Sequence, residues 1–96
     1  MIENLNKVFE SRVRLGIMSI LMVNDWVPFK QLKELLGVTD GNLASHLAAL
    51  EKKALVEVHK EFVNKKPLTT YKATQEGYLE FKKHLEALEA LINKKL

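Results

Sequence analysis

The sequence predicts a mainly α-helical domain that carries a β-hairpin before its last helix, and three observations lead to this prediction. Residues 32–55 place apolar side chains at helical spacing on both sides of a tight turn at Gly37. Residues 56–62 alternate in part between apolar and polar side chains, as a half-exposed strand does. Residues 74–95 return to a helical period. The expected order is therefore helix, short strand, helix, helix, hairpin, helix.

The length and composition are those of one small folded domain. The chain has 96 residues, of which 47% are hydrophobic and 28% charged, so we expect a single domain over residues 1–96. Its most apolar run, residues 16–23, is much shorter than the roughly 18 residues that suggest a membrane span, and no membrane partner is expected. There is no cysteine, which excludes disulfides and thiolate metal sites, and no secretion signal is recognisable. We therefore expect a cytoplasmic protein.

The first long helix is expected over residues 5–23. From Val13 onward it is apolar on nearly every side, and such a helix has to be covered on every side. In one interpretation, one face packs inside the domain while another meets a second copy of the chain, through Val13 and Ile17. The alternative is a central helix that its own domain wraps completely.

A short extended segment and a second helix are expected next. Residues 26–27 should be extended, because a residue that precedes proline avoids helical geometry. The helix should begin at Pro28 or Phe29 and end at Gly37 in the left-handed conformation. Trp26 and Phe29 are interpreted as core side chains rather than as an aromatic ligand site. The stripe expected to be buried on this helix comprises Phe29, Leu32, Leu35 and Leu36.

The third helix, about residues 39–53, has an unusual outer face. Thr39 is expected to cap it, and leucines at positions 43, 47 and 50 form its inner face. A surface helix normally presents long charged side chains to solvent, whereas this outer face is small and nearly uncharged, as if another large surface had to come close. If residues 39–42 formed only a cap and turn, Thr39 would be explained but the small face would not. The outer face carries Gly41, Ser45, Ala48 and Lys52.

The hairpin is expected over residues 56–73, with a turn at Asn64-Lys65-Lys66-Pro67. Thr74 is expected to cap the last helix, about residues 74–95. Its apolar residues form a heptad seam that is too short to make a coiled coil alone, so we expect this helix and the first one to join two copies of the chain. The seam comprises Tyr78, Phe81, Leu85, Leu88 and Ile92.

This order of elements, with a three-helix core, a hairpin wing and a long last helix, is that of a winged helix-turn-helix. A helix fits the major groove of B-DNA, about 12 Å wide, and its first turns usually touch the bases. Asn42 can bond adenine through both polar atoms of its amide, and Asp40 can accept from a cytosine amine. The residues expected to contact DNA are Thr39, Asp40, Gly41, Asn42, Ser45 and His46 from the helix, and Asn64, Lys65 and Lys66 from the hairpin tip.

Several of these assignments have an alternative. The net charge of +3 permits nucleic-acid binding without requiring it, and the tip lysines could simply be solvated, like Lys30 and Lys33 on the second helix. His46 either donates to a phosphate or bonds inside the domain. Catalysis is not expected, because no nucleophile, phosphate loop or paired-carboxylate motif is present, and the three histidines lack metal-ligand spacing. No metal or other cofactor is expected, although a metal site between two chains is an alternative.

Five stretches carry a resemblance: RLGIMSIL (14–21), FKQLKELLGVTDGNLASHLAALEKKALV (29–56), KKP (65–67), TTYKAT (69–74) and TQEG (74–77). Through these motifs, which span nearly the whole chain, the sequence resembles the winged-helix transcriptional regulators of the MarR/ArsR type, especially small members with a C-terminal dimerisation helix. The resemblance implies a homodimer that binds double-stranded DNA at a pseudo-palindromic operator and regulates transcription. It implies a recognition helix at residues 39–53, a wing at residues 63–69 and, in many members, a small-molecule or metal effector.

The chain departs from the family pattern at particular positions. Ala54 stands where a glycine usually ends the recognition helix, so either a left-handed alanine costs about 1 kcal/mol or the helix ends differently. Ala44 and Ser45 replace the usual order around the base-contacting turn, and lysines replace arginine at the wing tip. The main rival function is a winged helix that binds another protein and has no affinity for DNA. A more distant rival is an enzyme subunit or a ligand sensor.

Overall fold

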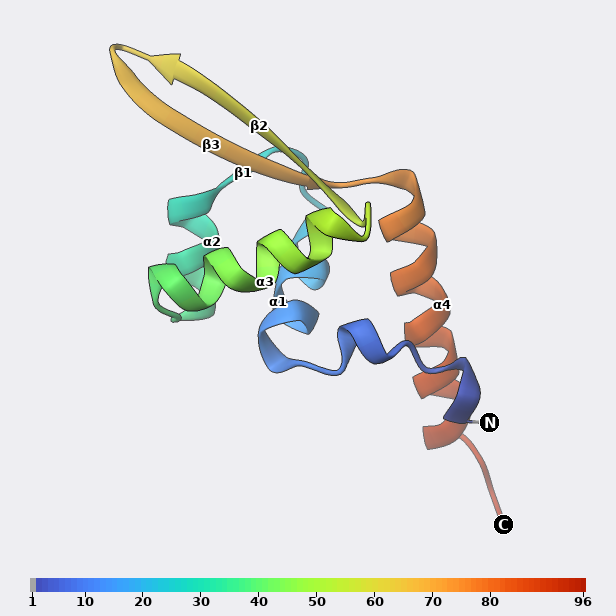
Figure 1. Ribbon diagram of the computed structural model, residues 1–96. Helices are drawn as coiled ribbons and strands as arrows, with labels where there is room; N and C mark the ends of the chain where they lie inside the picture. Colours follow the sequence, from blue (N-terminus) through green and yellow to red (C-terminus); the bar gives the residue numbers. More distant parts are fainter. Residues whose placement is uncertain (1) are drawn as a thin grey trace.

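The computed structural model describes residues 2–96 and has the predicted winged helix-turn-helix architecture (Figure 1). Four α-helices surround a small core, and a three-stranded antiparallel sheet extends into a long hairpin. None of the helices in this range is long and apolar enough to cross a membrane. The elements in order are η1 (Ile2–Asn4), η2 (Lys7–Phe9), α1 (Arg12–Leu21), β1 (Val27–Pro28), α2 (Phe29–Leu36), α3 (Asp40–Lys52), β2 (Val56–Val63), β3 (Lys66–Ala73) and α4 (Gln75–Ile92).

The first helix is shorter than predicted, because two polar side chains cap separate elements ahead of it. The Asn6 carboxamide oxygen accepts from the Val8 N–H at 3.0 Å and starts the 3₁₀ helix η2. The Ser11 hydroxyl then accepts from the Arg14 N–H at 3.3 Å and starts α1. Such side chains compete with helical hydrogen bonds inside a helix and satisfy free N–H groups at its start. The predicted start near residue 5 is therefore wrong.

Helix α1 lies at the centre of the domain, as the alternative of a wrapped helix described. Ile17 and Met18 are fully buried, and Val13 packs against the core from a half-buried position. Gly16 lets α2 approach closely, because a Cβ atom there would meet the Leu36 side chain. The assignment of Ile17 to an interface with a second copy is wrong, since its own domain covers it.

The helix-turn-helix of α2 and α3 follows the local signals in the sequence. Gly37 ends α2 in the left-handed conformation with φ of 64°, and the Thr39 hydroxyl caps α3 by accepting from the Asn42 N–H at 3.2 Å. Leu35 was predicted to be buried but is 62% exposed, because it lies off the stripe that Phe29, Leu32 and Leu36 form along α2. The leucines at positions 43, 47 and 50 fill the core as expected.

The sheet has the order β1-β3-β2, and its hairpin reaches well beyond the helices (Figure 1). Strands β2 and β3 pair from Val56↔Ala73 to Val63↔Lys66, which leaves a two-residue turn. Both turn residues, Asn64 and Lys65, have positive φ (53° and 64°), as the turn type that suits the twist of a tight hairpin requires. The turn is tighter than the predicted four residues, and Lys66 and Pro67 belong to β3.

Helix α4 begins against the segment that ends the recognition helix. The Thr74 hydroxyl accepts from the Gly77 N–H at 2.9 Å and donates to the Ala54 carbonyl at 2.7 Å, while the Thr74 N–H donates to the Leu55 carbonyl at 3.1 Å. Ala54 adopts the left-handed conformation with φ of 59°, one of the two outcomes expected there. A Cβ atom at Gly77 would overlap the Leu55 carbonyl oxygen. This close joint fixes α4 relative to the end of α3.

Candidate nucleic-acid interface

The small face of α3 is open to solvent. Gly41, Ser45, Ala48 and Lys52 are all exposed, and no other part of the chain between residues 2 and 96 buries them. A Cβ atom added at Gly41 would meet no atom within 4 Å, so packing inside the domain does not explain the glycine. The face is accessible to a large partner along the length of the helix.

The first turn of α3 presents a mixed set of polar groups. Thr39, Asp40 and Asn42 are exposed, and the Thr39 hydroxyl is occupied by capping. The Asp40 carboxylate lies 2.9 Å from the Lys33 ammonium of α2. Because both side chains are exposed, this ion pair adds little stability, but it engages one lysine that could have contacted DNA. Asn42 is exposed, and its side-chain amide makes no hydrogen bond to another described residue, since only its backbone N–H is bonded.

His46 makes the internal hydrogen bond that one of its two interpretations required. The Arg14 Nε–H donates to His46 Nδ1 at 2.9 Å, and the Arg14 Nη1 donates to the Val8 carbonyl at 3.3 Å. Desolvation by burial, and secondly the Arg14 charge, lower the pKa of His46, which favours a neutral ring. With Nδ1 accepting, the ring proton lies on Nε2. Donation from Nε2 to DNA stays a prediction.

The wing tip is a cationic projection. Asn64, Lys65 and Lys66 are exposed, and neither tip lysine forms an ion pair within the described part of the chain. Sequence reasoning missed two further exposed apolar side chains beside them, Phe62 at 78% and Val63 at 45% exposure. Phe62 falls on the apolar side of the alternation in residues 56–62, together with Val56 and Val58, but near the tip there is no core to cover it. The position of Phe62 near the predicted turn, far from the start of the strand, was the feature of the sequence that could have indicated its exposure.

Trp26 lies on the outer face of the sheet, so its assignment to the core is wrong. It is 40% exposed and has a φ of 53°. Val27 is buried in the core, whereas Trp26 precedes strand β1 in a left-handed rather than an extended conformation. There the Lys72 ammonium lies 5.3 Å from the Trp26 ring centroid, and the His59 ring packs edge-to-face with Trp26, with the two ring centroids 5.8 Å apart. Phe29 does pack against the core, as predicted.

The residues predicted for a dimer interface divide into two groups. Tyr78, Leu85, Leu88 and Ile92 form an exposed apolar strip along α4. Phe81 is buried within the protomer, so its assignment to the interface is wrong: the Phe9 ring of the N-terminal segment packs edge-on against it at 5.1 Å. Val13 lines a separate hollow beside Gly37 and Val38. A heptad pattern cannot reveal that a distant segment covers one of its positions.

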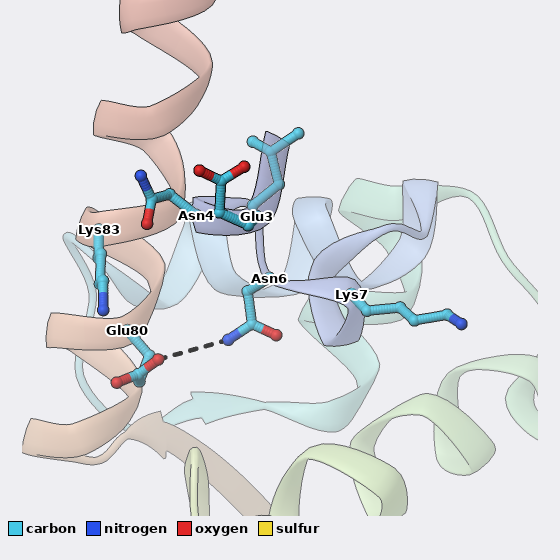
Figure 2. A pocket seen from close by; sticks show the side chains of 7 residues that line it. Glu3, Asn4, Asn6, Lys7, Glu80 and Lys83 are labelled. Carbon is cyan, nitrogen blue, oxygen red and sulfur yellow. Dashed lines mark hydrogen bonds between the residues drawn. The ribbon is translucent and has the colours of Figure 1, made fainter. Parts of the chain in front are cut away.

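The N-terminal segment is hydrogen-bonded to α4, beside a polar hollow of about 260 Å³ (Figure 2). The Asn6 N–H donates to His84 Nδ1 at 2.9 Å, and the Asn6 side-chain amide lies 3.4 Å from the Glu80 carboxylate. Burial lowers the pKa of His84, while Glu10 opposes this shift, so the ring stays a neutral acceptor. Asn6 thus joins this segment to α4, and the Val8 carbonyl joins it to Arg14 of α1, which in turn bonds His46 of α3.

Comparison with known proteins places the chain in a family. The family of the winged helix DNA-binding domain matches residues 13–92. An uncharacterised protein of Methanocaldococcus jannaschii is 38% identical over 79 residues, which are 82% of this chain and 86% of that protein.

Two solved structures carry the comparison further. A transcriptional regulator homologue from Pyrococcus horikoshii superposes with a TM-score of 0.80 at 35% identity, over 95% of each chain. A MarR-family regulator from Enterococcus faecalis superposes with a TM-score of 0.67 at 26% identity, over 95% of this chain and 74% of that one. The chain therefore belongs to the winged helix DNA-binding domain family, and the solved structures it resembles are those of transcriptional regulators, one of them of the MarR family.

Proposed function

We propose that this protein is a homodimeric transcriptional regulator that binds double-stranded DNA sequence-specifically at a pseudo-palindromic operator. The observation that carries the proposal is the open, small outer face of α3. Membership of the winged helix DNA-binding domain family supports it. An α3 face covered by another part of the chain would not admit a duplex so closely.

In the proposed complex, α3 lies in the major groove. Gly41 and Ala48 allow the helix backbone to come close to the groove walls, because neither side chain reaches beyond a methyl group. Asn42 and Ser45 supply hydrogen bonds to base edges, and Asn42 is suited to adenine. Asp40 accepts from a cytosine amine in competition with Lys33. His46 donates its Nε2–H to a phosphate or base at the edge of the groove.

The wing tip supplies charge rather than sequence information. Lys65 and Lys66 would lie against phosphates or in the flanking minor groove, with Asn64 beside them. Each neutralised phosphate releases counterions, so the affinity should fall steeply with salt. A winged helix that binds another protein instead would have almost no salt-dependent affinity for DNA.

The apolar strip of α4 is the proposed dimer contact. Tyr78, Leu85, Leu88 and Ile92 leave apolar side chains exposed along one side of the helix, and Ile92 is 81% exposed. Pairing two such edges about a two-fold axis would remove this apolar surface from water. The two recognition helices would then have to lie about 34 Å apart to enter successive major grooves.

Selection of bound sequences from random duplexes tests the proposal, with light scattering to measure the mass of the free protein. We expect an enriched inverted repeat whose half-site centres lie about one helical turn apart, and a dimer in solution. The matched variant is Lys65→Glu with Lys66→Glu, which should weaken DNA binding without unfolding the protein. Recovery of no enriched motif at low salt would count against DNA recognition. If that variant instead kept its full DNA affinity, the wing would have no part in binding.

A further inference from the structure

The segment ahead of α1 lies beside α4 and buries little of its own surface (Figure 2). Residues 2–7 include no buried side chain, and Val8 is half-buried. Phe9, which follows directly, is fully buried and packs against the rings of Phe81 and His84. We call residues 2–8 the N-terminal strap. Because the strap has so little apolar contact with the domain, its position depends on hydrogen bonds.

The two shorter ties of the strap both depend on a histidine that accepts at Nδ1. The Asn6 N–H donates to His84 Nδ1 at 2.9 Å. The Arg14 guanidinium donates from Nε to His46 Nδ1 at 2.9 Å and from Nη1 to the Val8 carbonyl at 3.3 Å, so His46 orients the group that holds Val8. A backbone N–H and a guanidinium can only donate. Both histidines therefore have to be unprotonated at Nδ1 while the strap is held.

Protonation turns each of these acceptors into a donor. An imidazolium carries hydrogen on both ring nitrogens, so a protonated His84 would direct Nδ1–H at the Asn6 N–H, and that bond would be lost. A protonated His46 would face the Arg14 guanidinium, and two cations at this distance repel each other. Arg14 would then turn away and release the Val8 carbonyl. Protonation of the two rings thus removes both ties.

The charges around His84 act in opposite directions. Burial lowers the pKa of His84, and the Glu10 carboxylate just after η2 acts against this shift. Four further charged side chains line the hollow between the strap and α4, namely Glu3, Lys7, Glu80 and Lys83. Because the net shift is downward from 6.5, the ring is neutral above that pH and gains its proton below it.

His46 has a cationic neighbour. Burial lowers its pKa, and the Arg14 charge lowers it further. Arg14 of α1 is the charged side chain that faces this ring from the elements packed against α3. On α3 itself, the residues one turn away are uncharged: Asn42, Leu43, Ala49 and Leu50. Both histidines therefore accept at neutral pH and lose this ability in acid.

We propose that the N-terminal strap is released by acid, because His84 and His46 hold it against α4 and α1 only while both rings are neutral. Phe9 stays in the core, so the release is local. After release, α4 keeps its attachment to the end of α3 at Thr74 and loses its attachment through Asn6. The release does not depend on the proposed function, whereas its effect on operator recognition rests on that function.

The geometry favours release of the strap as one unit. Asn6 and Val8 are two residues apart, and the Asn6 side chain also caps η2 by accepting from the Val8 N–H at 3.0 Å. Losing either tie therefore frees the backbone that positions the other. The remaining contact, from the Asn6 side-chain amide to the Glu80 carboxylate, is long at 3.4 Å and cannot replace them.

A pH titration of the folded protein, followed by NMR, tests the release. The imidazole C–H signals of His84 and His46 report protonation, and the backbone amide signals of residues 2–8 report the strap. We expect the strap amides to take on the relaxation of a mobile chain in the same step in which the two rings titrate, below pH 6.5. The amides of Leu47 and Leu50 in the core should keep their positions.

His84→Asn is the decisive variant. Its side-chain oxygen can accept from the Asn6 N–H, as Nδ1 does, but it does not titrate. The variant should therefore keep the Asn6 amide in place at a pH where the wild type releases it. His59→Asn is the matched control, because this third histidine is exposed and packs against Trp26 on the sheet, and the control should release the strap like the wild type.

Three results would overturn the proposed release. The rings of Phe9 and Phe81 could hold an imidazolium through cation–π attraction, and both histidines would then titrate while the strap amides stay fixed. The strap and core amides could change in one step, which would be unfolding of the whole domain. The strap could also be released at the same pH in His84→Asn as in the wild type, which would exclude His84 as the acceptor that matters.

A second measurement separates this inference from the proposed function. The affinity for a selected duplex is compared with that for a duplex whose half-sites lie one base pair further apart, in neutral and in acidic buffer. We expect the wild type to lose part of its preference for the selected spacing in acid and His84→Asn to keep it. His46 titrates in both proteins, so its charge does not account for the difference.

The outcomes are distinct. If the wild type binds no duplex in either buffer, the proposed function fails, and the NMR titration still decides whether the strap is released. If the strap is released while the spacing preference of the wild type stays the same in acid, the effect on operator recognition is overturned and the release stands. If the strap stays attached in acid while the duplex is bound, the inference fails and the proposed function stands.

Discussion

Substituting alanine at Gly77 tests whether the joint between α4 and the end of α3 is as tight as described. A Cβ atom at this position would overlap the Leu55 carbonyl oxygen, and backbone atoms cannot rotate away as a side chain can. The start of α4 would have to shift. Two hydrogen bonds span this joint, from the Thr74 hydroxyl to Ala54 and from the Thr74 N–H to Leu55, and both depend on the present spacing.

The magnitude follows from these contacts. Losing two hydrogen bonds costs about 1 kcal/mol each, whereas alanine in place of glycine in a helix returns about 0.5 kcal/mol by restricting the unfolded chain. We therefore expect Gly77→Ala to lower the free energy of unfolding by about 1.5 kcal/mol. For a domain of this size, that corresponds to a fall of roughly 6–12 °C in melting temperature.

Gly41→Ala is the matched control. This glycine also lies in the first turn of a helix, but a Cβ atom there would meet nothing within 4 Å. We expect this variant to gain about 0.4–1 kcal/mol of stability and, because a methyl group now stands on the open face of α3, to bind DNA less tightly. Urea unfolding of both variants measures the difference. The reasoning is refuted if Gly77→Ala is as stable as the wild type or more so, or if both glycine variants shift stability in the same direction.

Three further predictions follow from the site. Burial lowers the pKa of His84 and of His46 below the ordinary value of 6.5, so the unfolded chain binds more protons than the folded chain. The contribution of these rings to the free energy of unfolding is therefore complete above pH 6.5 and should decline as the pH falls below 6.5. Urea midpoints at a series of pH values measure this decline, and His84→Asn should make it smaller. A stability that rises as the pH falls would contradict the prediction. Asn42→Ala should cost about 1–3 kcal/mol of DNA affinity and relax specificity at one base pair, as selection with the variant would reveal; unchanged specificity would exclude Asn42 from base reading. Leu85→Ser with Ile92→Ser should yield a folded monomer by light scattering, whereas Phe81→Ala should lower the stability of the fold by about 3–5 kcal/mol; a dimer that survives the first change would place the interface elsewhere.

Most elements of the fold depend on residues close together in the sequence, and for this reason the sequence alone was sufficient to predict them. Thr39 and Thr74 were predicted to cap α3 and α4, and they do. Such a cap is predictable because the side chain bonds a backbone N–H only two or three residues further along the chain. Gly37 was predicted to be left-handed and is. The leucine stripe of α3 was equally visible, since periodicity needs no partner to be detected.

The errors arose where a residue's surroundings come from far along the chain. Phe81 fits the heptad seam of α4 perfectly well, yet Phe9 covers it, 72 positions earlier in the sequence. Trp26 looks like a core residue by composition, but its position at the edge of a two-residue strand turns it outward. The start of α1 is a different case: Ser11 ahead of the apolar run was a recognisable cap, and the apolar period concealed it.

The long-range contacts, which the sequence could not reveal, together fix the orientation of α4 relative to α3. Helix α4 is held to the end of α3 by Thr74 and Gly77, and to the N-terminal segment by the bond from Asn6 to His84. The same segment reaches the middle of α3 through Arg14 and His46. Two attachments at separate points fix the angle between the two helices, not only their distance. In a dimer joined through α4, that angle would set the separation of the two recognition helices. The protein should therefore prefer one operator spacing sharply, and loosening either attachment should broaden the preference before it abolishes binding.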